Sequence, residues 1–195
     1  AEWWVELRFQ KIINHNPDRA YDFQYKDFDL HSFFKGVTLK EVGIVQTVID
    51  SGGTVIRGTV NCARLNGLKW YELIFAKRLD IEGIIFERPL FRITLSDHPK
   101  KKTSGKGLQE LFGDIISRAD LSRFRIENGS IILMTPNDDS IRGTLSNLNL
   151  EADEIETDSL MWSNLIPFKL GSLESSIDSL SFQINDYTHV STGSI

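Results

Sequence analysis

The chain has 195 residues, of which 41% are hydrophobic and 25% are charged, enough to bury a real core as one domain or two small ones. Its net charge of −5 excludes nucleic-acid binding driven by bulk positive charge. The single cysteine, Cys62, excludes an internal disulfide and is expected to act as a buried small hydrophobic residue. Since the sequence has no apolar run of about 18 residues, it predicts no membrane-spanning helix.

The amino-terminal residues predict an amphipathic helix over 3–14. Apolar side chains recur there three and four positions apart, and Asn16 and Pro17 end the pattern. Trp3 and Trp4 lie very close to the start of the sequence. We expect this pair to follow a membrane anchor, because tryptophan favours the membrane interface.

Residues 21–56 predict strands. Tyr21, Phe23 and Tyr25 alternate with polar residues, which is the two-residue period of a half-buried strand. The alternation slips by one residue after Lys26, which indicates a bulge. Residues 37–48 predict a further strand with a second irregularity.

Residues 58–95 are the best-organised stretch and predict a strand, a short helix and two more strands. Gly67 ends the first strand, and apolar residues on two sides of the helix require it to be covered. Gly83 indicates a bulge or bend. Pro89 cannot donate to a strand ladder, so we expect it at a strand start or on an edge strand.

Residues 96–107 contain one proline, two glycines and four lysines but no aliphatic side chain, which is typical of a mobile loop or linker. We therefore divide the chain into a β-rich unit with helices over 1–95, a flexible linker over 96–107 and a second β-rich unit over 108–195. The second unit is expected to continue the same sheet and to be a truncated piece of a longer chain.

The second unit predicts a short helix near 107–116 and then more strands. The Asn128-Gly129 pair between apolar residues is typical of a two-residue hairpin turn, because both residues tolerate positive φ. The whole pattern predicts a mainly β (α+β) fold. We expect a twisted, bulged antiparallel sheet of about eight to eleven strands that forms an open groove or half-barrel, with two or three short helices.

Two segments resemble the AsmA-like family, which is related to the TamB-like β-groove proteins. The first runs over 65–93 and contains Leu-Asn-Gly-Leu-Lys-Trp, and the second contains Phe-Arg-Ile-Glu-Asn-Gly-Ser-Ile at 124–131. The resemblance covers about half of the chain. It implies a membrane-anchored periplasmic protein whose β-groove serves phospholipid transport or outer-membrane biogenesis, without catalysis. The sequence departs from the family in its short length and in having no anchor of its own.

The sequence shows no pattern that is typical of a catalytic, metal or phosphate-binding site. The four histidines are far apart in sequence, and Asp22, Asp27 and Asp29 lack the glycine-containing loop of a calcium site. The Ser104-to-Gly107 segment lacks the first glycine and the final serine or threonine of a phosphate loop. We therefore expect a protein that is not an enzyme and that uses no metal and no cofactor.

We expect a periplasmic domain, anchored to the inner membrane, that binds phospholipid or the membrane in an apolar β-groove and does not bind nucleic acid. The alternative is a structural module of a larger envelope protein, which pairs its sheet edges with neighbouring repeats. The residues expected to line the groove or face the membrane are Trp3, Trp4, Trp70, Leu73, Ile74, Ile81, Phe91 and Ile93. The residues expected to contact head groups are Lys100, Lys101, Lys102 and Lys106, which otherwise form only a solvated loop.

Overall fold

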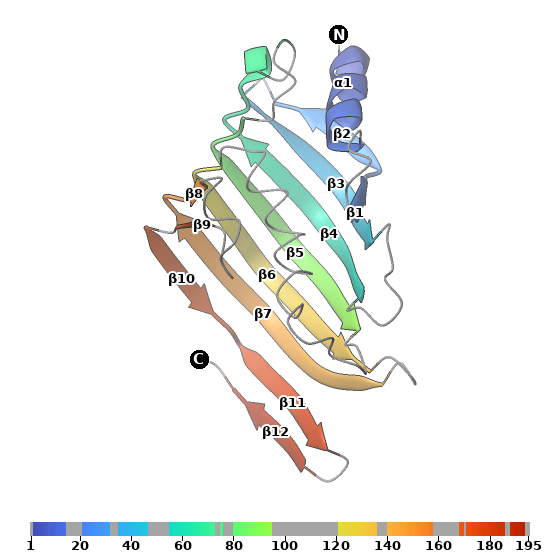
Figure 1. Cartoon of the computed structure of the whole chain (residues 1–195), viewed down its shortest axis with the longest axis vertical. Helices are drawn as coiled ribbons and strands as arrows, with labels where there is room; N and C mark the ends of the chain where they lie inside the picture. The colour runs from blue at the N-terminus through green and yellow to red at the C-terminus, as the bar shows by residue number, and fades with distance from the viewer. Residues whose placement is uncertain are drawn as a thin grey trace.

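A computed structural model describes residues 2–14, 21–31, 35–46, 55–72, 75, 80–94, 121–135, 140–157, 168–169, 171–185 and 188–193. These residues form one helix and twelve strands (Figure 1). The elements are α1 (Glu2–Asn14), β1 (Tyr21–Gln24), β2 (Asp27–Leu30), β3 (Gly36–Gln46), β4 (Val55–Asn66), β5 (Gly83–Thr94), β6 (Arg123–Met134), β7 (Ile141–Asp153), β8 (Glu156–Thr157), β9 (Phe168–Lys169), β10 (Ser172–Ser176), β11 (Ser179–Asn185) and β12 (Thr188–Thr192).

Ten of the strands form one open sheet. The central order is β1-β3-β4-β5-β6-β7-β11-β12, with β2 also paired to β3 and β10 also paired to β7. The mainly β prediction is therefore confirmed, and strands from both predicted units lie in a single sheet. The predicted linker over 96–107 and the predicted helix near 107–116 lie outside the described residues.

The expected all-antiparallel arrangement is wrong, because β5 and β6 run parallel. A parallel pair needs a crossover of a dozen or more residues, whereas an antiparallel pair can close with a tight turn. The chain between Thr94 and Arg123 is long enough for such a crossover. One helix, α1, is found in the described part of the chain, and Trp70 and Tyr71 begin a helical turn.

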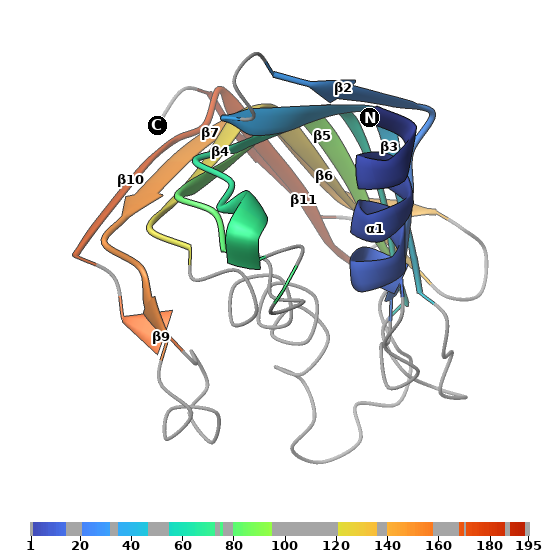
Figure 2. The ribbon, with the colours of Figure 1, turned by 90° about the horizontal axis from the view of Figure 1, so that it is seen from above.

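The sheet is curved, and α1 lies on its concave side (Figure 2). The predicted amphipathic helix is confirmed, and it buries Phe9 completely. The Phe9 ring meets Phe28 of β2 edge-on, with ring centroids 5.6 Å apart. Phe9 belongs to a core cluster that includes Val37, Ile56 and Phe86 from the inner face of the sheet. The core therefore lies on the concave side.

A transverse crease crosses the sheet, and it is the most regular feature of the fold. On either side of the crease, inward-facing residues are two positions apart along each strand. At the crease this spacing becomes three, so that two consecutive residues point to the outer face. One of them, Cys62 of β4, is nevertheless buried, as expected from the sequence. The flanking inward positions are Tyr25 and Phe28, Leu39 and Val42, Val60 and Ala63, Phe86 and Pro89, Ile126 and Gly129, Leu145 and Leu148, and Ile177 and Leu180.

Positive φ angles mark the crease in four strands, β3, β5, β6 and β7. They occur at Glu41 (48°), Arg88 (49°), Asn128 (53°) and Asn147 (52°). At both ends of the crease the strand itself is interrupted, between β1 and β2 and between β10 and β11. The registers of β3–β4, β4–β5 and β5–β6 continue across the crease without a shift, because both strands of each pair carry the same three-residue spacing. Seven such irregularities in one line make the bend a property of the whole sheet.

The crease explains why two predictions are wrong, the hairpin turn at Asn128-Gly129 and the position of Pro89 at a strand start or on an edge strand. Asn128 and Gly129 lie in the middle of β6 and form no hairpin turn, because the positive φ that Asn128 tolerates is used in the crease. Pro89 lies in the central strand β5, fully buried. A bulge accepts proline inside a sheet because a ladder donor is missing there in any case. Gly83, expected at a bulge or bend, begins β5.

Candidate apolar surface

The inner face of the sheet is a set of apolar rows that run across the strands. Directly paired residues on neighbouring strands point to the same face. One row starts at Ile56 on β4 and passes through Ile93, Leu133, Gly143 and Phe182 to Val190 on β12. A second row starts at Ile44 and passes through Gly58, Phe91, Ile131 and Leu145 to Leu180. The sequence supplies these rows through the two-residue period of each strand.

Exposure rises along these rows towards the carboxyl-terminal edge. Ile56 and Ile93 are only 1% and 8% exposed, whereas Phe182 and Val190 are 37% and 51% exposed. Leu180, at the end of the second row, is 40% exposed. We call Leu180, Phe182 and Val190 the apolar shelf. The shelf continues the inner face of the sheet beyond its buried part.

The shelf is packed directly on the neighbouring strand. Gly143 on β7 leaves room for the Phe182 ring, and a Cβ atom at position 143 would lie 2.8 Å from Phe182 Cδ2. The same arrangement occurs in the buried part, where the Phe91 ring lies 2.8 Å from the Cβ position of Gly58. The two glycines allow large rings of the next strand to lie flat over the backbone. Phe182 is thus held by packing although it is partly exposed.

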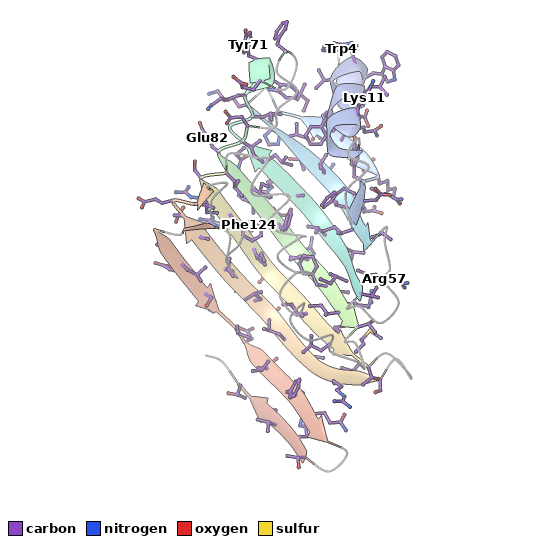
Figure 3. All side chains as sticks on the ribbon, viewed as in Figure 1. Trp4, Lys11, Arg57, Tyr71, Glu82 and Phe124 are labelled. Carbon is purple, nitrogen blue, oxygen red and sulfur yellow. The ribbon has the colours of Figure 1, made fainter. Side chains whose placement is uncertain are left out.

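A second group of exposed apolar residues lies at one end of the molecule. Trp3 and Trp4 of α1 are 71% and 42% exposed. Tyr71 and Phe75 are 70% and 71% exposed, and their ring centroids are 4.9 Å apart. Figure 3 shows Trp4 and Tyr71 at the same end, beyond the strands. We call these four residues the aromatic end.

The convex face is polar and carries ion pairs across its strands. Arg123 and Arg125 of β6 face carboxylates of β7, as Arg123 pairs with Asp153 and Arg125 with Glu151. The hydrogen bond to Asp153 raises the pKa of Arg123, and the hydrogen bond to Glu151 raises the pKa of Arg125. Arg123 is exposed and the other three groups are partly exposed, and ion pairs at the protein surface contribute little to stability. The two faces therefore differ mainly in apolar surface area, which is concentrated on the concave face.

The crease is also lined by polar contacts on the convex face. Lys26 Nζ donates to Glu41 Oε1 at 2.9 Å, and this contact raises the pKa of Lys26. At the other end, Asn147 Nδ2 donates to Asp178 Oδ2 at 2.8 Å. Because outward residues at the crease come in consecutive pairs, polar side chains are concentrated there. The contacts join strands rather than converge on a point.

The predicted site residues fall into three groups. Trp3 and Trp4 are exposed and belong to the aromatic end, and Trp70 packs against the core. Ile81, Phe91 and Ile93 are buried, with exposed fractions of 0%, 6% and 8%. Lying outside the described residues are Leu73, Ile74, Lys100, Lys101, Lys102 and Lys106. The apolar shelf was not predicted from the sequence, although the alternation of Leu180 and Phe182 with serines was a signal for it.

No protein-family model matches the chain, and no curated protein matches it. In the described part of the chain, no three histidine, cysteine or acidic residues gather as metal ligands would. None of the described helices has the length and apolar character needed to cross a membrane. The observations define a class of architecture, an open and creased β-sheet with one polar and one apolar face.

Proposed function

We propose that this protein is a periplasmic, membrane-associated domain that binds lipid acyl chains along the concave face of its sheet. The observation that carries the proposal is the apolar shelf, where Leu180, Phe182 and Val190 extend the buried rows to the protein surface. Leaving apolar area in water costs about 25 cal/mol per Å². An acyl chain laid along these rows would remove that cost. The location, the membrane anchor and a role in outer-membrane biogenesis or phospholipid transport come from the resemblance to the AsmA-like family.

The aromatic end fits the same proposal. Tryptophan and tyrosine prefer the level of the lipid head groups, because their rings are apolar and their edges are polar. Trp3, Trp4, Tyr71 and Phe75 would rest at the membrane surface. The concave face would then lead away from the membrane along the strands. The apolar shelf on β11 and β12 lies towards the opposite end of the sheet (Figure 1), so a lipid that leaves the bilayer here would reach the shelf along the concave face.

Two valine substitutions on opposite faces provide the test. Val190 is 51% exposed on the shelf, and Val45 is 45% exposed on the convex face. We expect Val190→Ser to weaken binding of a fluorescent fatty acid to the purified protein by about threefold to tenfold, as expected from burying one such side chain. Val45→Ser should leave the affinity unchanged.

Native mass spectrometry of the wild-type protein gives an independent readout, with co-purified lipid as the expected result. Equal affinities for the two valine variants, or a lipid-free protein that also fails to bind the fatty acid, would contradict the proposal. The aromatic end is tested separately by flotation with phospholipid vesicles. Trp3→Ala combined with Tyr71→Ala should reduce the floated fraction.

The alternative is a structural module that pairs its sheet edges with other strands. It is favoured by the difference between the two edges of the sheet, of which one is charged and the other is not. The edge formed by β1 and β2 carries Asp22, Lys26, Asp27 and Asp29. Charged residues protect an edge from pairing. The β12 strand, Thr188–Thr192, has the sequence THVST, and its five residues are exposed. It has neither a proline nor a lysine or carboxylate to block an added strand.

A proline substitution tests this alternative. Ser191→Pro removes one backbone donor from β12. If the edge recruits a further strand from a second molecule, this change shifts the mass measured by light scattering towards the monomer. The corresponding change on the charged edge, Asp29→Pro, should have no effect on that mass. Identical masses for both variants and the wild type would count against edge pairing between copies.

A further inference from the structure

We propose that Arg57 and Arg92 on the convex face form a binding site for a doubly charged phosphate group. The two arginines are direct register partners on the antiparallel strands β4 and β5, and both are exposed. Residues in this relationship have Cβ atoms about 5 Å apart. Two guanidinium groups on the same face can therefore reach one anion. Figure 3 marks Arg57 near the start of β4.

In the part of the chain that the structure describes, the surroundings of this pair contain no compensating acid. Along the row, Arg57 is flanked by Val45 and Arg92 is flanked by Ile132. The nearest carboxylate in the row is Asp22 on β1, the register partner of Val45. Its Cα atom is two strands from Arg57, or about 10 Å. Within the described residues, neither arginine forms an ion pair.

The rest of the convex face shows that the arrangement is unusual for this protein. Beyond the crease, Arg64 pairs with Glu87, Arg123 with Asp153 and Arg125 with Glu151. The chain has 27 acidic and 22 basic residues, so carboxylates are not scarce. Like charges placed directly opposite each other destabilise a sheet. Because β4 and β5 are central strands, the need to protect an edge does not explain the pair.

The chemistry of the pair selects the ligand. A guanidinium group is a planar fork that binds phosphate oxygens in pairs and stays charged at all physiological pH values. Two forks side by side match the two charges of a phosphate or phosphate monoester, whereas a carboxylate needs only one. The hydroxyls of Thr59 and Thr94 lie two residues along on the same face. They can donate to the remaining oxygens.

The test is a two-dimensional NMR titration of the full chain with inorganic phosphate and pyrophosphate, at constant ionic strength set with chloride. We expect shifts confined to the amides of residues 55–59 and 90–94. Arg92→Gln should weaken binding by about tenfold, as for the loss of a charge-assisted hydrogen bond. Arg57→Lys keeps the charge but loses the fork, and should weaken binding by a smaller factor.

Arg142→Gln is the matched control. Arg142 is an exposed arginine of β7 on the same face, and its replacement by glutamine removes the same charge as Arg92→Gln does. It should change the affinity by less than about twofold, in line with a screened interaction at a distance. A loss in Arg142→Gln equal to that in Arg92→Gln would overturn the site in favour of net charge alone. Shifts spread over the whole spectrum, or no binding, would also overturn it.

A second experiment distinguishes a lipid head group from a soluble phosphate as the ligand. Vesicles of phosphatidic acid in phosphatidylcholine are compared with pure phosphatidylcholine vesicles in a flotation assay. Flotation that needs phosphatidic acid and is lost in Arg92→Gln identifies a lipid head group. Binding of inorganic phosphate without flotation identifies a soluble phosphate. Since Val190→Ser reports on the concave face alone, failure of this site and failure of acyl-chain binding are distinguishable.

Discussion

Arg88 of β5 and Asn128 of β6 immediately follow the paired residues Glu87 and Glu127 on parallel strands, and both adopt positive φ, at 49° and 53°. Asparagine visits this region at modest cost, but arginine does so rarely. The two residues are adjacent members of the crease. The sheet therefore holds an unfavourable backbone conformation where its strands bend together.

Replacing Arg88 by glycine should stabilise the protein. Glycine adopts positive φ without steric cost, whereas the left-handed region costs other residues about 1–2 kcal/mol. After the entropic cost of glycine, we expect Arg88→Gly to raise the free energy of unfolding by about 0.5–1 kcal/mol. Urea denaturation measures the change.

The matched control is Arg92→Gly, since Arg92 is also an exposed arginine of β5 but lies outside the positive-φ residues. Glycine there should lower the free energy of unfolding by up to about 0.5–1 kcal/mol, a loss that relief of the like-charge contact with Arg57 reduces. The two substitutions thus differ in sign. If both destabilise the protein equally, the crease holds no backbone strain at Arg88.

Substitution of Gly143 should loosen the apolar shelf. An added Cβ would lie 2.8 Å from the Phe182 ring and 3.2 Å from the Ser181 carbonyl oxygen. We expect Gly143→Ala to lower the free energy of unfolding by about 1–3 kcal/mol, as overpacking does. Gly193→Ala is the control, because nothing lies within 4 Å of its Cβ position. Its effect should stay within about 0.5 kcal/mol, and a similar loss in both variants would contradict the packing of Phe182 on Gly143.

Removal of the Phe9 ring should detach α1 from the sheet. Phe9 is 0% exposed and meets Phe28 edge-on. Truncation of such a ring costs about 3–5 kcal/mol through lost burial and the cavity left behind. Trp3→Ala on the same helix should change stability by less than about 0.5 kcal/mol, since Trp3 is 71% exposed. Chemical denaturation compares the two, and equal losses would mean that α1 is not held through Phe9.

Stability should fall at alkaline pH through Tyr25. Burial of its hydroxyl raises the pKa of Tyr25 to about 12, with a smaller contribution in the same direction from Glu6. In the unfolded chain tyrosine ionises near pH 10. Between about pH 10 and 12 the unfolded state therefore loses a proton that the folded state keeps. Below about pH 10 Tyr25 does not lower the free energy of unfolding, and between about pH 10 and 12 its ionisation in the unfolded state lowers it progressively.

Tyr25→Phe removes the ionisable group. Its free energy of unfolding should decline less steeply than that of the wild type in denaturation series from pH 9 to 11.5. Absorbance of the tyrosinate band gives a second measurement, since the variant lacks the late-titrating group. Parallel pH profiles for the two proteins would contradict the shifted pKa.

The sequence predicts much of each strand by itself. The alternation of Tyr21, Phe23 and Tyr25 with polar residues marks a real strand, and the slip after Lys26 marks a real interruption. The helix over 3–14 follows from apolar residues three and four positions apart. Side-chain period is a local property, and local properties are what a single sequence displays.

The pairing of strands that are distant in the chain could not be predicted from side-chain period. The parallel pair β5 and β6, and the alignment of Glu41, Arg88, Asn128 and Asn147 in one crease, depend on registers between segments far apart in the chain. The same is true of the candidate site. Leu180 and Phe182 look like ordinary strand residues until their row is followed back to the core.

The sequence by itself determined which residues of each strand are apolar and where the alternation slips. Only the tertiary structure decided that those slips form a single line, that Asn128 and Gly129 continue a strand instead of turning it, and that Arg57 faces Arg92. The physical reason is that side-chain alternation is set by the backbone of one strand, whereas register is set by the burial of all the strands together.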